Sequence, residues 1–112
     1  MKFVLAGMLV FSELAAQRPI DGREQEKRLI TEMRPVVSPG CAGLRVVPVQ
    51  AFINEQGQVV KVKKHSQKVV KAVPEFLWSL AAAAVKKLHY RPLLVGGVPT
   101  AVKTVVDVPC QQ

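Results

Sequence analysis

The sequence predicts an α+β fold in which one main helix covers a three-stranded antiparallel sheet. Between Pro74 and Pro92, apolar residues recur at the three-and-four spacing that gathers side chains on one face of a helix: Leu77, Leu80, Ala81, Ala84, Val85 and Leu88. Valine-rich segments of high β-propensity precede and follow this stretch. A single amphipathic helix needs an apolar surface to cover, so two layers are expected, in the order strand, strand, helix, strand.

The first 34 residues predict export followed by a polar lead-in. Residues 1–16 read MKFVLAGMLVFSELAA, with one lysine, an apolar run and small residues at the end, which is the plan of a secretory signal peptide cleaved after Ala16. The apolar run is about half as long as a bilayer span requires. A buried N-terminal helix or strand is the alternative. Residues 17–34 are mostly charged and fit either a short helix capped by Asp21 or a loose segment.

Residues 35–112 form the predicted domain, which opens with a loop and a β-hairpin. Pro39, Gly40 and Gly43 predict a loop over Val36 to Gly43. The run from Leu44 to Asn54 predicts a strand in which Pro48 causes a bulge or an unpaired position. Glu55 to Gly57 make a tight reversal, and Gln58 to His65 alternate apolar and charged residues as a half-buried strand does.

The helix and the last strand follow from local signals. Pro74 suits the first helical position, and Glu75 complements the positive end of the helix dipole. Pro92 ends helical geometry at Arg91. Gly96 and Gly97 then mark a turn, and Ala101 to Val108 form a third strand that Pro109 terminates.

Chain direction predicts the strand order and a disulfide. The hairpin reverses the chain and the helix returns it, so in an antiparallel sheet the third strand lies beside the first and the order is second, first, third. This order brings Cys41, before the first strand, close to Cys110, after the third. An even cysteine count in an exported chain favours the same bond.

No constellation supports catalysis. The serines lie in no nucleophile motif, and His65 and His89 have no spacing that indicates a base or a metal site. We therefore expect no enzyme activity, no cofactor, no metal and no small-molecule substrate.

The predicted sheet has two edge strands, and one of them has few charged residues that would discourage pairing with another strand. Lys61, Lys63 and Lys64 discourage pairing along the second strand. The third strand can accept an extended peptide by β-augmentation through the residues Val102, Lys103, Thr104, Val105, Val106, Asp107 and Val108. Two alternatives remain: a homodimer through the same edge, or a basic domain that binds nucleic acid or anionic envelope polymers, since the net charge is +8 and the pI about 9.9.

From Arg34 to Cys110 the chain resembles the C-terminal domain of TonB-type energy transducers. The resemblance is carried by the valine-rich first strand, the turn that contains Gly57 and Val59, the triplet Tyr90-Arg91-Pro92, the turn with Gly97 and Pro99, and the final valine strand. It implies a periplasmic module whose last strand binds the TonB box of outer-membrane receptors. It also implies a link to a membrane-anchored motor complex, here through another protein.

Overall fold

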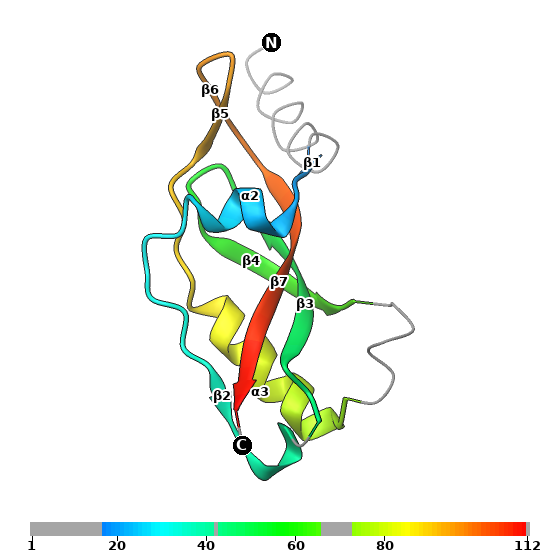
Figure 1. Ribbon diagram of the computed structural model, residues 1–112. Helices are drawn as coiled ribbons and strands as arrows, with labels where there is room; N and C mark the ends of the chain where they lie inside the picture. Colours follow the sequence, from blue (N-terminus) through cyan, green and yellow to red (C-terminus); the bar gives the residue numbers. More distant parts are fainter. Residues whose placement is uncertain (1–16, 42, 66–72, 112) are drawn as a thin grey trace.

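The computed structural model describes residues 17–41, 43–65 and 73–111; the predicted signal peptide lies outside them. These residues form an α+β fold with one main helix, as predicted, but the sheet has five strands rather than three (Figure 1). The strands are β1 (Arg18–Pro19), β2 (Val36–Val37), β3 (Val46–Ile53), β4 (Val59–Lys64) and β7 (Val102–Gln111). Their order is β1-β7-β3-β4, and β2 also pairs with β7.

The three long strands are neighbours in the order β4, β3, β7, with β3 antiparallel to both of the others. The predicted three-stranded layout is nevertheless wrong, because β1 and β2 pair in parallel with the outer edge of β7. Each of these added strands has only two residues, which is too short a run to predict a strand from sequence. Their pairing is decided by contact with β7 and not by local propensity.

Two prolines lie within the sheet at positions where a missing N–H costs no ladder bond. Cys110 N–H donates to Arg45 O at 2.9 Å, so the even-numbered residues of β7 bond to β3 and Asp107 does not. Pro48 lies opposite Asp107, so its nitrogen points away from β7. It also lies one residue before Val49, the first residue of β3 that pairs with β4. The nitrogen of Pro109 points away from β3, because Pro109 is an odd-numbered residue of β7. The strand therefore continues through Pro109 to Gln111 instead of ending there as the sequence predicted. The bulge lies at the other end of β3, where the register shifts between Phe52 and Ile53.

The main helix, α3 (Glu75–Lys86), covers one face of the sheet. Pro74 is its N-cap with extended backbone, one position before the predicted one. Leu77, Ala81 and Val85 are fully buried and pack in one core with alternate residues of β3 and β7. Burying each Leu or Val contributes about 2 kcal/mol. Leu80, which the periodicity placed on the buried face, is 48% exposed.

A two-stranded hairpin extends beyond the sheet at the end opposite β2 (Figure 1). It consists of β5 (Leu93–Val95) and β6 (Val98–Thr100). Gly96 and Gly97 both have positive φ, 59° and 82°, as a tight two-residue hairpin turn requires. The predicted turn is therefore present.

The lead-in segment packs against the sheet. Asp21 caps α2 (Gly22–Glu26), because its Oδ1 accepts a hydrogen bond from Arg23 N–H at 3.2 Å. Ile20, Leu29 and Met33 pack against the core. The segment predicted as a loop from Val36 contains β2 and the single turn of 3₁₀ helix η1 (Pro39–Cys41).

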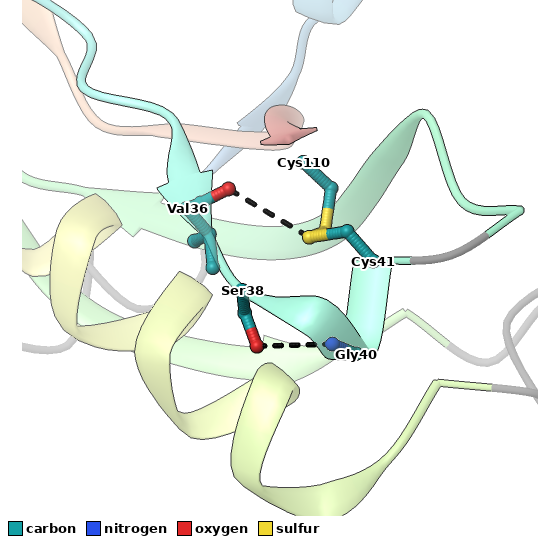
Figure 2. The surroundings of a disulfide bond; sticks show 5 residues. All are labelled: Val36, Ser38, Gly40, Cys41 and Cys110. Atoms are coloured by element: carbon teal, nitrogen blue, oxygen red, sulfur yellow. Dashed lines mark hydrogen bonds between the residues drawn. A yellow bond between two sulfur atoms is a disulfide. The ribbon is translucent and has the colours of Figure 1, made fainter. Parts of the chain in front are cut away.

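The predicted disulfide between Cys41 and Cys110 is present, with the two Cα atoms 5.5 Å apart (Figure 2). It joins η1 to the end of β7, and Cys41 Sγ lies 3.7 Å from Val36 O. Ser38 supports the turn, since its Oγ accepts a hydrogen bond from Gly40 N–H at 3.1 Å. The bond thus ties β2 and its turn to the sheet at one end of the molecule.

Candidate functional site

The outer edge of β7 is covered at its two ends. At the first end, Ala101 O and Lys103 O accept hydrogen bonds from Arg18 N–H and Ile20 N–H, each at 2.9 Å. At the other end, Gln111 O accepts from Ser38 N–H at 2.8 Å. The outward backbone groups of β7 therefore belong to its odd-numbered residues. β1 covers these groups at Ala101 and Lys103, and β2 covers them at Gln111.

Between these ends, Val105 and Asp107 carry the remaining outward backbone groups. No backbone hydrogen bond to another segment is present at these groups within residues 17–41, 43–65 and 73–111. Gly22 packs against the Val105 carbonyl so closely that a Cβ there would overlap the oxygen. Of the predicted edge residues 102–108, the structure thus leaves Asp107 and the N–H of Val105 open, because Lys103 pairs with β1 and the even-numbered residues pair with β3.

A pocket of about 250 Å³ lies beside this gap, between β7 and the lead-in segment. Thr104 and Gln25 line it and are buried, with 3% and 2% of their surface exposed. Gln25 Oε1 accepts a hydrogen bond from Arg28 Nη1 at 3.1 Å. The Thr104 hydroxyl is buried and has no partner in the described structure. Leu29, Met33, Val106 and Tyr90 supply the apolar lining.

The charges that line the pocket are opposite in sign to the chain as a whole. Asp21 and Glu26 contribute two carboxylates, and Arg23 contributes one guanidinium. Asp107 also lines the pocket, but as an odd-numbered residue of β7 it directs its side chain to the other face of the sheet. The chain itself has a formal charge of +8. An acidic pocket on a basic protein favours a cationic guest group over an anionic one.

Sequence reasoning missed the lead-in side of this pocket. The sequence places Gln25 and Glu26 in a polar segment before the domain, and nothing in their spacing indicates contact with β7. The one signal available was Asp21, whose capping of a helix was foreseen as one of two alternatives.

Tyr90 links the pocket to two other segments. Its N–H donates to Gly57 O at 2.9 Å, and it pairs with Leu29 in an isolated β-bridge. A Cβ at Gly57 would overlap the Tyr90 carbonyl oxygen, and Gly57 has a φ of 84°. The neighbouring Arg91 donates its N–H to Arg28 O at 2.7 Å and its Nη2 to Lys27 O at 2.8 Å.

The residues of the family motif therefore have structural positions. Gly57, Tyr90 and Arg91 join the hairpin turn, the end of the helix and the lead-in segment. Val59 packs against the core at the start of β4. Pro92 precedes β5, and Gly97 and Pro99 lie in the protruding hairpin, away from the pocket that β7 shares with the lead-in.

Tyr90 is also the only tyrosine in the sequence, so its ionisation can be followed directly. Burial, and secondly the nearby Glu26 carboxylate, raise the pKa of its phenol from 10.0 to about 12. In a near-ultraviolet pH titration, we expect the folded protein to form phenolate near pH 12 and the protein unfolded in denaturant to form it near pH 10. Unfolding between these values releases a proton, so stability should fall as the pH rises from 10 to 12. If the phenol of the native protein ionised near pH 10, as in the unfolded protein, this result would contradict the buried position of Tyr90.

The sheet face opposite α3 carries a second charged feature. Lys61 and Lys63 of β4 place their Nζ atoms 5.6 and 5.8 Å from the centre of the Phe52 ring. Lys103 pairs with Phe52 from the other side, on β7. We call Phe52, Lys61, Lys63 and Lys103 the basic face.

The described residues contain no group of three or more His, Cys, Asp or Glu side chains that could hold a metal ion. No helix within the same residues is long and apolar enough to cross a membrane. A scan of protein-family models matches no family, and neither the curated proteins nor the solved structures give a match. The resemblance to TonB-type domains therefore stays a prediction.

Proposed function

We propose that this chain is a periplasmic protein-binding module that pairs the middle of β7 with an extended segment of a partner protein. The observation that carries the proposal is the gap in the outer edge of β7 at Val105 and Asp107. Main-chain hydrogen bonds from such an edge supply affinity for an extended peptide. The resemblance to TonB-type domains names the partner class, which is the TonB box of outer-membrane receptors.

The geometry favours an antiparallel guest. A guest residue placed opposite Asp107 can exchange two hydrogen bonds with its N–H and C=O. The next open donor is the N–H of Val105, whereas the Val105 carbonyl is in contact with Gly22. The guest is short, because β1 and β2 close the edge at Lys103 and Cys110.

Titration of the mature protein with TonB-box peptides, followed by amide resonances, tests the proposal. We expect the largest shifts at Val105 and Asp107, with smaller ones along β1 and α2. The blocking variant is Asp107→Pro, which removes the outward N–H at a position where Pro109 shows that β7 tolerates proline. The matched control is Asp107→Ala, which loses the same carboxylate but keeps the N–H. Unchanged β7 resonances with every peptide would overturn the proposal.

The basic face supports a second candidate function, the binding of nucleic acid or another anionic polymer. Three lysines surround one aromatic ring on the sheet face opposite α3, which no helix within residues 17–41, 43–65 and 73–111 covers. In the same spectra, a single-stranded oligonucleotide would shift Phe52 and its neighbours rather than Asp107, with affinity that falls steeply as salt is added. If the peptide shifts the resonance of Asp107 and the oligonucleotide does not shift that of Phe52, peptide binding is favoured over polymer binding.

A further inference from the structure

We propose that the pocket beside β7 selects guest segments that carry a lysine or arginine side chain. This inference rests on the proposed function, because the side chain belongs to the segment that pairs with β7. Even-numbered residues of β7 face the helix side of the sheet, as the burial of Thr104, Val106 and Val108 shows. A guest residue opposite Val106 therefore directs its side chain to the same side, where the pocket lies.

The buried hydroxyl of Thr104 is the first reason for a polar guest group. It is 3% exposed and unpartnered, which leaves a buried polar atom without the hydrogen bond that such atoms normally make. An ammonium or guanidinium group brings several N–H donors and no acceptor, and can donate to this oxygen. An aliphatic guest side chain leaves the hydroxyl unpartnered.

The surrounding carboxylates are the second reason. The carboxylates of Asp21 and Glu26 outnumber the guanidinium of Arg23 among the charged side chains that the lead-in segment brings to the pocket. The apolar side chains of Leu29 and Met33 line the same pocket and suit the aliphatic stem of lysine or arginine. A guest carboxylate could accept a hydrogen bond from the Thr104 hydroxyl, but it meets net negative charge from Asp21 and Glu26.

Binding of a short Thr/Val peptide with a single lysine at successive positions tests the selectivity. At the position opposite Val106 we expect the lysine peptide to bind about tenfold more tightly than the norleucine peptide, and the glutamate peptide to bind most weakly. In the Glu26→Gln protein the preference for lysine over norleucine should shrink severalfold, and in the nearly isosteric Thr104→Val protein it should shrink as well. The matched control is Glu24→Gln: it lies on the same helix outside the pocket, next to Lys27 and Arg28, and should leave the preference unchanged.

The outcomes separate the two proposals. If no peptide shifts Val105 or Asp107, the proposed function itself fails. If the lysine and norleucine peptides shift these residues with equal affinity, or if Glu24→Gln lowers the preference as much as Glu26→Gln, the selectivity is overturned while the peptide site stands.

Discussion

The substitution Gly57→Ala is expected to destabilise the domain by about 3 kcal/mol, as the sum of a left-handed backbone at alanine and a disrupted buried contact. Gly57 has a φ of 84°, and a Cβ at this position would overlap the Tyr90 carbonyl oxygen. To relieve the overlap, the hydrogen bond from Tyr90 N–H to Gly57 O must lengthen or break. Chemical denaturation of the purified variant measures the loss.

Gly97→Ala is the matched control for this prediction. Gly97 has nearly the same φ, 82°, but an added Cβ there meets no atom within 4 Å. Gly97→Ala should therefore lower the stability only by the cost of a left-handed backbone at alanine, about 1 kcal/mol. Equal losses at the two glycines would show that the contact with Tyr90 contributes nothing.

Breaking the disulfide should have the largest effect on stability. In the chain-entropy model, a loop closed by cysteines 69 residues apart stabilises the fold by about 4 kcal/mol. Its loss leaves η1 and β2 attached to the end of β7 only by non-covalent contacts such as the hydrogen bond from Ser38 N–H to Gln111 O. We expect a large drop in the denaturation midpoint when reductant is added.

The double variant Cys41→Ala/Cys110→Ala controls for effects of the reductant. It should match the reduced wild-type protein in stability and show no further response to reductant. A wild-type midpoint that is the same with and without reductant would contradict the prediction.

Local sequence signals predicted the elements whose cause is local. The spacing from Leu77 to Leu88 predicted α3, and the paired glycines at 96 and 97 predicted the hairpin turn. The exposure of Leu80 was not predictable in this way, because periodicity identifies a helix face but not how wide a strip of it the sheet covers. The prediction that Pro109 ends the strand was wrong for a related reason. A proline removes a hydrogen bond from the sheet only if its nitrogen faces a paired strand, and the sequence does not show which way the nitrogen faces.

The candidate site was predictable only in part. Counting chain reversals placed β7 beside β3 and Cys41 near Cys110, as the structure shows. The reduction of the open edge to Val105 and Asp107 was not predictable, because Arg18 and Val36 begin strands of two residues that exist only through β7. Nor could the sequence place Gln25 and Thr104 in one pocket, since they are joined by packing across the chain.

The sequence by itself determined the main helix and the long strands, because periodicity and turn residues act over short distances. Counting chain reversals added the neighbourhood of β7 and β3 and that of Cys41 and Cys110. Only the tertiary structure decided which part of the β7 edge stays open and what lies beside it. That depends on how the lead-in segment packs, and the packing energy of residues such as Leu29 and Met33 against the core is set by neighbours far away in the chain.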